Sequence, residues 1–253
     1  MQIITLIQTK GGSGKTTVAM SLASAALAKG EKVCMFDGDV NRQLLGWQDA
    51  YEEADWGRVK KAPWPVALTI RQPPASVEDL YAEVEALEAS GTDLLIIDTR
   101  PGTYKDTDDL ALVADVVVIP AKPAQAEWRL VLSAFKWMED LSKTISDEDS
   151  FPQVRSVLAN VPTKIINAAA RVGGSKLPQH DRVVLDNLLG TPHFDTMLPN
   201  SRLFEHFLHH GPLPVAQYAH RAAKGGTLMA NNFEDLTMIC ISLYDEIKGS
   251  AAQ

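Results

Sequence analysis

The sequence contains few cysteines. Its two, Cys34 and Cys240, lie far apart in the chain. This number and spacing exclude the disulfide framework that stabilises small secreted domains. Cys34 lies in an apolar, strand-like run and Cys240 in a helix-like run. We therefore expect both to be small, buried apolar side chains in a reducing compartment.

The chain also lacks an excess of positive charge and a long apolar run. It has 24 Lys and Arg against 32 Asp and Glu, a formal net charge of −8. This balance excludes a uniformly basic surface, so any contact with nucleic acid would need a local basic patch. No segment approaches the roughly 20 apolar residues of a membrane-spanning helix, and the apolar start lacks the basic region of a secretory signal. We expect a cytoplasmic protein that does not bind membranes.

What the chain does have is the length and apolar content for one large domain. Its 253 residues, 45% of them hydrophobic, suit a single α/β domain over residues 1–253. Short apolar runs alternate with amphipathic stretches, which predicts a doubly wound, mostly parallel sheet with helices on both faces. The expected strands are Ile3–Ile7, Lys32–Asp37, Asp93–Asp98, Asp115–Pro120 and Val154–Asn160, with weaker ones at Val66–Ile70 and Phe194–Leu198.

Helices are expected where apolar residues recur at helical spacing. The first runs from about Lys15 to Lys29, and a third covers 124–143. Between them, Val77–Ala89 is preceded by Ser76 and has Asp79 in its first turn, which resembles a capping box. Residues 46–75, by contrast, look like an irregular excursion at one edge of the sheet.

A glycine-rich turn lies between the first expected strand and the first expected helix. Such a turn lets backbone N–H groups point at phosphate oxygens, and the helix N-terminus adds its positive dipole end. Lys15 would reach the β- and γ-phosphates and the Thr16 hydroxyl would hold Mg²⁺. Thr9 replaces the usual first glycine, and a second lysine, Lys10, precedes the double glycine. The predicted nucleotide-binding residues of this turn are Gly11, Gly12, Ser13, Gly14, Lys15, Thr16 and Thr17.

Carboxylates follow two of the other expected strands. Asp37 and Asp39 end the second strand, and Asp98 follows four apolar residues at the end of another. The carboxyl ends of parallel strands form the ligand-binding edge of an open sheet. There, one carboxylate can hold the shell of Mg²⁺ while another orients an attacking water. The sequence therefore predicts a site for ATP or ADP and Mg²⁺, with Thr16, Asp37 and Asp98 around the metal.

Taken in this order, Lys10–Thr17, Asp37-Gly-Asp39 and Asp98-Thr-Arg-Pro resemble the deviant Walker A ATPases of the ParA/MinD family, above all its ParA-like branch. The resemblance covers most of the chain. It implies a nucleotide-sandwich dimer in which Lys10 reaches the partner's ATP, as an arginine finger would. It also implies that Asp39 activates water and that Asn160 contacts adenine. Lys10, Lys15 and Asp39 are thus the expected catalytic residues.

The chain also departs from the common family pattern. Asp39 is followed by Val-Asn instead of Pro-Gln, and Arg100 stands where a proline is common. Asn41, Arg42 and Trp47 are more similar to the VirC-type relatives, which help process DNA for conjugative transfer.

The ParA-like resemblance implies a slow ATPase that is stimulated by a ParB-like or adaptor protein. Its ATP-bound homodimer would bind DNA non-specifically, associate with the nucleoid, and segregate or position a plasmid, chromosome or protein cluster. Phosphate contacts from both subunits would make this binding strongly dependent on salt. The expected DNA contacts are Arg202, Arg221 and Lys224, with Arg171, Lys176 and Arg182 as further candidates.

Three other functions stay open. The first is a VirC-like accessory factor in conjugative DNA transfer, which would use ATP as an assembly switch. The second is a MinD-like spatial regulator, which is disfavoured because residues 246–253 are poor in the apolar bulk and cations of a membrane-binding helix. The third is a metabolic P-loop ligase or kinase, which would gain nothing from Lys10.

Overall fold

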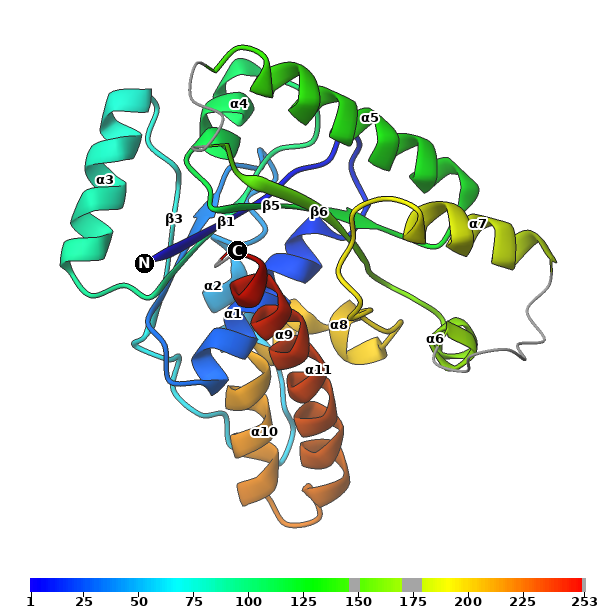
Figure 1. Ribbon diagram of the computed structural model, residues 1–253. Helices are drawn as coiled ribbons and strands as arrows, with labels where there is room; N and C mark the ends of the chain where they lie inside the picture. The colour runs from blue at the N-terminus through cyan, green and yellow to red at the C-terminus, as the bar shows by residue number, and fades with distance from the viewer. Residues whose placement is uncertain (146–150, 170–178, 252–253) are drawn as a thin grey trace.

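The computed structural model describes residues 1–145, 151–169 and 179–251. In this part of the chain the strands form one parallel sheet in the order β3-β2-β4-β1-β5-β6 (Figure 1). The predicted doubly wound parallel sheet is therefore confirmed. The strands are β1 Gln2–Leu6, β2 Val33–Asp37, β3 Leu68–Arg71, β4 Leu94–Asp98, β5 Val116–Ala121 and β6 Gln153–Leu158.

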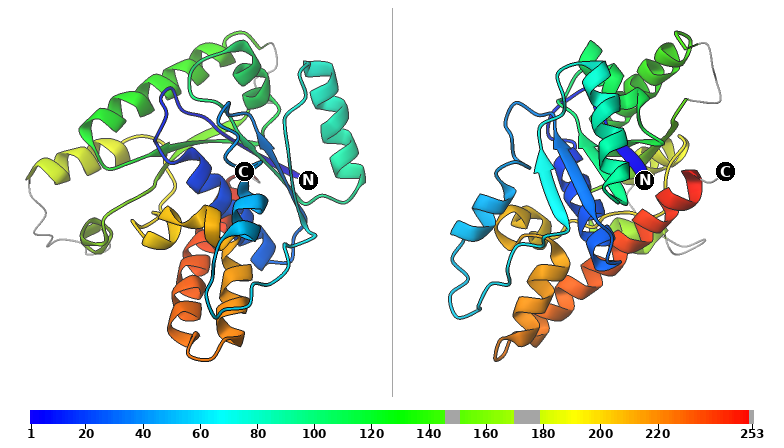
Figure 2. Two further views of the ribbon diagram at one scale, coloured as in Figure 1. Left: turned by 180° about the vertical axis from the view of Figure 1, so that it is seen from behind. Right: turned by 90° about the vertical axis from the view of Figure 1, so that its left-hand side faces the viewer.

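Helices cover both faces of the sheet (Figures 1 and 2). One apolar cluster joins the sheet to α1, α10 and α11, and the other joins it to α3, α4, α5 and α7. Alternate residues of a strand belong to opposite clusters, as Ile3 and Ile4 do, which is why these strands are apolar throughout. The helices are α1 Lys15–Ala28, α2 Trp47–Glu53, α3 Val77–Ala89, α4 Lys105–Leu112, α5 Gln125–Ser142, α6 Thr163–Ala169, α7 Gln179–Leu189, α8 Arg202–Glu205, α9 Phe207–His210, α10 Leu213–Ala222 and α11 Thr227–Ala251.

The helix α3 has the predicted bounds, and its N-terminus has the predicted cap. The Ser76 hydroxyl oxygen accepts the backbone N–H of Asp79 at 3.1 Å, and Ser76 also donates to the Asp79 carboxylate at 2.7 Å. These bonds use a donor that the first helical turn would otherwise leave unpaired.

The expected irregular excursion contains a short helix with a buried tryptophan. Trp47 opens α2, is fully buried, and donates its indole N–H to the Phe207 carbonyl at 2.9 Å. Its ring also meets those of Phe207 and Trp64 edge to face, with centroids 5.6 and 5.5 Å away. These contacts fix α2 to α9, and with it the loop that connects β2 to α2.

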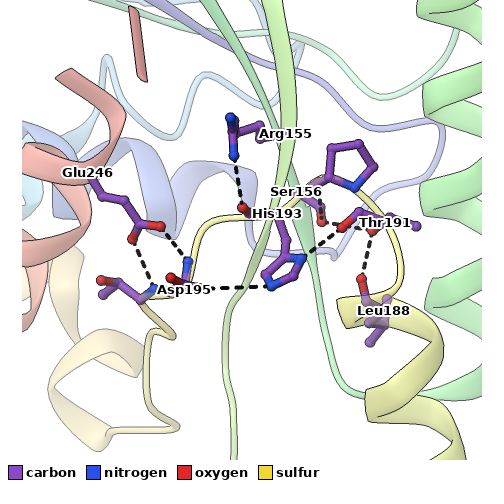
Figure 3. A network of polar contacts seen from close by, with 9 residues as sticks. Arg155, Ser156, Leu188, Thr191, His193, Asp195 and Glu246 are labelled. Atoms are coloured by element: carbon purple, nitrogen blue, oxygen red, sulfur yellow. Dashed lines mark hydrogen bonds and ion pairs between the residues drawn. The ribbon is translucent and has the colours of Figure 1, made fainter. Parts of the chain in front are cut away.

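The weaker prediction of a strand at Phe194–Leu198 is wrong. Around this segment the structure has only isolated bridges, Ser156 to His193 and Val161 to Pro199. The backbone N–H groups of Asp195 and Thr196 bind the Glu246 carboxylate of α11 instead of a neighbouring strand (Figure 3). A side chain from a distant helix thus takes the two donors in the middle of this segment. The N–H groups of Phe194 and Leu198 at its ends still bond to the carbonyls of Ser156 and Leu158 of β6, so the pairing is interrupted and no continuous strand forms.

We expect Glu246→Ala to lower the free energy of unfolding by about 2 kcal/mol, because hydrogen bonds to a charged group contribute roughly 1.5–3 kcal/mol. The midpoint of urea denaturation would measure the loss. Glu85→Ala, at an exposed position of α3, removes the same charge as a control and should leave the midpoint in place. Equal midpoints for the two variants would contradict the role given to Glu246.

Both cysteines are free and buried, as predicted. Burial raises the pKa of the Cys240 thiol to about 12, so this side chain behaves as an apolar group. Among the helices that the structure describes, none combines the length and apolar character needed to cross a bilayer.

Candidate nucleotide-binding site

A cavity of about 470 Å³ opens at the carboxyl edge of the sheet. The glycine-rich turn forms one wall, and segments that follow β2, β4, β5 and β6 form the others. Most of the residues predicted to bind nucleotide lie in its lining. Those are Gly11, Gly12, Gly14, Lys15, Thr16, Thr17, Asp39 and Asn160. The structure thus brings together residues from three separate stretches of the sequence.

The turn itself depends on glycine at two positions. Gly12 has φ +83° and Gly14 has φ +101°, a left-handed conformation in which other residues are strained. Gly14 also directly precedes α1 and closes its first turn by accepting the Val18 N–H at 2.9 Å. Ser13 is buried, its hydroxyl has no partner among the residues that the structure describes, and it is not among the lining residues.

The two lysines of the turn have different surroundings. Lys15 is only 6% exposed and lines the cavity. Lys10 is exposed, is not among the lining residues, and its ammonium has no hydrogen bond or ion pair within the described part of the chain. One chain therefore places Lys15 on its own cavity and leaves Lys10 free on the surface.

Thr16 and Asp98 are paired at the base of the turn. The Thr16 hydroxyl donates to Asp98 Oδ2 at 2.6 Å, while Oδ1 of the same carboxylate is buried without a partner in the described structure. Burial raises the pKa of Asp98 to about 7, against the opposing effects of Lys15 and of the Thr16 hydrogen bond. An unpartnered carboxylate oxygen beside a hydroxyl offers the hard oxygen donors that Mg²⁺ prefers. The oxygen atoms of Thr16 and Asp98 are therefore suitable ligands for Mg²⁺.

The two carboxylates at the end of β2, Asp37 within the strand and Asp39 just after it, have different contacts. Asp37 accepts the backbone N–H groups of Asp39 at 3.1 Å and Leu45 at 3.0 Å, and it is not among the lining residues. Asp39 does line the cavity, and its Oδ1 accepts from the backbone and side chain of Asn41 at 2.9 and 3.0 Å. Asp37 holds the loop, and Asp39 faces the ligand space.

The loop that follows β2 touches the loop that follows β4 at Gly38. The Gly38 N–H donates to the Asp98 carbonyl at 2.8 Å, and a Cβ on Gly38 would lie 3.2 Å from that same oxygen. The β4 loop is also joined to the glycine-rich turn, because the Gly102 N–H donates to the Gln8 carbonyl at 3.0 Å. Three loops of the site are therefore connected through their backbones.

Arg100 lies on the far side of this loop. Its guanidinium stacks 3.7 Å from the centre of the Tyr104 ring and donates to Asp106 of α4 at 2.6 Å. It is not among the residues that line the cavity. The residue that departs from the family pattern therefore holds the loop against α4.

Several lining residues were not predicted. Most come from the segment between β6 and α9, far in sequence from the glycine-rich turn, and only the family resemblance pointed to that region. Lys122 could have been found, since it directly follows a buried strand at the ligand-binding edge. The lining residues that the prediction missed are Asn41, Gln43, Pro101, Lys122, Ala159, Leu198, Pro199, Asn200, Ser201, Phe204 and Glu205.

The candidate DNA contacts Arg202, Arg221 and Lys224 are not among the residues that line the cavity. Exposed Arg202 begins α8 and lines a groove together with residues of α11, and Arg221 pairs with Glu234 of α11 at 2.7 Å. Lys224 is exposed just after α10. Both arginines therefore lie beside α11. Of the further candidates, Arg182 lies in α7, whereas Arg171 and Lys176 lie outside the described residues.

Comparison with known proteins gives both a family and a fold. The VirC1 protein family matches residues 1–245. Protein virC1 of Rhizobium radiobacter is 29% identical over 142 residues, so the match spans 56% of this chain and little more than half, 58%, of that protein. The MinD cell division protein of Aquifex aeolicus is 17% identical with a TM-score of 0.64, covering 98% of each chain. A structure of pNOB8 ParA bound to nonspecific DNA is 14% identical with a TM-score of 0.60, covering 99% of this chain and 98% of that one.

Proposed function

Because this chain belongs to the VirC1 family and has the fold of the ParA/MinD-like ATPases, we propose that it is a Mg²⁺-dependent ATPase of conjugative DNA transfer. In this proposal residues 1–253 form one ATPase domain, which dimerises on binding ATP and then binds DNA. A transfer protein would stimulate hydrolysis and so release the dimer.

The different placement of the two lysines of the turn carries this proposal. A P-loop ATPase that works as a single chain needs a buried lysine such as Lys15. It has no use for an exposed, unpaired lysine five residues earlier. In a symmetric dimer that faces this edge, Lys10 of each subunit could reach the phosphates bound by the other, and its charge would stabilise the transferring phosphoryl group.

The remaining residues of the site have separate tasks in the proposed reaction. The glycine-rich turn and the N-terminus of α1 bind the phosphates, and Asn160 contacts the base. Thr16 and Asp98 hold Mg²⁺, which would neutralise charge on the phosphates. Asp39 orients the attacking water. Asp37 was predicted near the metal, but its contacts support a positioning role, because it accepts the Asp39 N–H at 3.1 Å.

Family membership favours DNA transfer over plasmid segregation as the cellular role. The solved ParA on nonspecific DNA shows that a protein of this fold can bind DNA. We assign the contact in this chain to the α11 side, because the candidate arginines Arg202 and Arg221 both lie there. A dimer would double the number of phosphate contacts. We expect the ATP-bound form to lie on DNA in the cytoplasm.

The test is ATP-dependent DNA binding on two fragments of equal length, one from a transfer-initiation region and one of shuffled sequence. We expect Mg²⁺-ATP to be required and the transfer-initiation fragment to bind at least about tenfold more tightly, measured by fluorescence anisotropy. Arg202→Gln should weaken binding to both DNA fragments. The control Arg129→Gln, which removes an arginine of α5, should bind both fragments like the wild type. Equal affinity for the two fragments would favour sequence-indifferent, ParA-like segregation, and binding that ignores ATP would refute both roles.

A further inference from the structure

One lysine of the nucleotide cavity has no task in the proposed function. Lys122 directly follows β5 and lines the cavity on its own chain. It is half-buried, and its ammonium forms no hydrogen bond or ion pair in the part of the chain that the structure describes. Partial burial weakens the hydration of an ammonium group, so an unpaired one at this depth favours a nearby anion.

The strand periodicity sets the direction of this side chain. Val116 and Val118 of β5 belong to the apolar cluster that contains α1, whereas Val117 and Ile119 belong to the opposite cluster. Continuing this alternation places Lys122 on the α1 face, where the glycine-rich turn begins that helix. Its presence in the cavity lining agrees with this direction.

Hydrogen bonds on both sides fix the backbone at the end of β5. Gln8, which precedes the turn, donates its side-chain amide to the Pro120 carbonyl at 3.0 Å. On the other side, the Ala159 N–H donates to the Ala121 carbonyl at 2.8 Å. Lys122 therefore starts from a rigid point between the glycine-rich turn and the strand that carries Asn160.

The cavity thus has a cation on each flank of the glycine-rich turn. Lys15 lies toward β4, where it lowers the pKa of Asp98, and Lys122 lies toward β5. Lys15 has a carboxylate nearby, whereas Lys122 has none within ion-pair distance in the described residues. The phosphate chain of a nucleotide is the anion that would lie between them.

We propose that Lys122 binds the phosphate chain of the nucleotide held by its own subunit, on the flank of the glycine-rich turn opposite Lys15. This inference rests on the proposed nucleotide site. It adds a binding residue that is supplied in cis, in contrast to Lys10.

The test is a calorimetric titration of Mg²⁺-ADP into the full-length chain, since binding of a diphosphate does not depend on the ATP dimer. We expect Lys122→Gln to weaken ADP binding by about tenfold or more, since a charged hydrogen bond contributes this much. The salt dependence of binding should also become shallower, and Lys122→Arg should recover part of the affinity. Lys136→Gln, which removes an exposed lysine of α5, is the matched control and should bind like the wild type.

The outcomes separate this inference from the function on which it rests. Wild-type protein that binds neither ADP nor ATP would refute the nucleotide site, and the inference with it. Tight binding by the wild type and an ADP affinity within about twofold for Lys122→Gln would overturn the inference alone. A loss seen with ATP in the dimer but not with ADP would assign Lys122 to the partner's nucleotide and overturn the cis contact.

Discussion

Lys10→Ala is expected to abolish the ATP-dependent dimer and lower the ATPase rate at least about 100-fold, while the single chain still binds ATP. A cation supplied in trans to the transferring phosphoryl group contributes roughly 10³–10⁵ in rate in related phosphoryl-transfer enzymes. ATP binding should persist because Lys10 is exposed and outside the cavity lining. Light scattering with a non-hydrolysed ATP analogue would report the dimer, and calorimetry the affinity. Lys15→Ala is the contrasting variant and should lose ATP binding itself.

Mixing two inactive variants would show whether Lys10 acts across the dimer. Lys10→Ala retains Asp39, and Asp39→Ala retains Lys10, so a mixed dimer contains one complete site. An equimolar mixture should recover up to about one quarter of the wild-type rate, because about half of the dimers are mixed and each has one working site of two. The mixed pair must still dimerise through its single Lys10 contact. A Lys10→Ala chain that dimerised and hydrolysed ATP normally would refute the trans role.

Asp98→Asn should have opposite effects on stability and on activity. In the metal-free protein Asp98 is buried with a pKa of about 7, well above the 3.8 of an unperturbed aspartate. Between these two values the folded state binds more protons than the unfolded state, so the ionisation of Asp98 lowers stability as pH rises. Asparagine cannot ionise and can still accept from Thr16. At pH 8 the variant should therefore be more stable than the wild type by about 4 kcal/mol.

The pH dependence identifies the cause of this stabilisation. The advantage of Asp98→Asn should be small near pH 4, grow with pH, and level off above pH 7, as measured by urea denaturation in the presence of EDTA. Adding Mg²⁺-ATP should reverse the order, since the wild type gains binding free energy that the variant has lost. Asp235→Asn, an exposed change of the same charge on α11, should shift neither curve. A gain that did not vary with pH would exclude ionisation of Asp98 as its origin.

The sheet and its helices were predicted well where the signal is local. Apolar runs marked the main strands, and Ser76 with Asp79 marked the start of α3 at the residue where the structure has it. The prediction at Phe194–Leu198 was wrong because the segment is apolar enough for a strand, yet the N–H groups of Asp195 and Thr196 bind Glu246, some 50 residues further along, and interrupt the pairing with β6. A pattern within one segment carries no information on such a partner.

In the candidate site, too, the residues with a local sequence signal were predicted, and those placed by distant contacts were not. The glycine-rich turn was predicted from its place after a strand, Asp39 from the strand end and the family resemblance, and Asn160 from the resemblance. Apart from Ser13, these predicted residues do line one cavity. The sequence could not tell that Asp37 bonds to its own loop, because two carboxylates two residues apart look alike until the backbone turns. Phe204 reaches the cavity only through the tertiary fold. These residues therefore needed the structure.

The close contact at Gly38 has a mechanical consequence. The Gly38 N–H bonds to the Asp98 carbonyl, and Gly38 has no side chain to separate the loop after β2 from the loop after β4. The two loops are therefore coupled and should move together. A displacement of Asp39 by a bound γ-phosphate would be transmitted through this coupling to Arg100 and to α4, which packs on the opposite face of the sheet. In the proposed ATP-bound state, this coupling would carry the occupancy of the cavity to a surface that the nucleotide never touches.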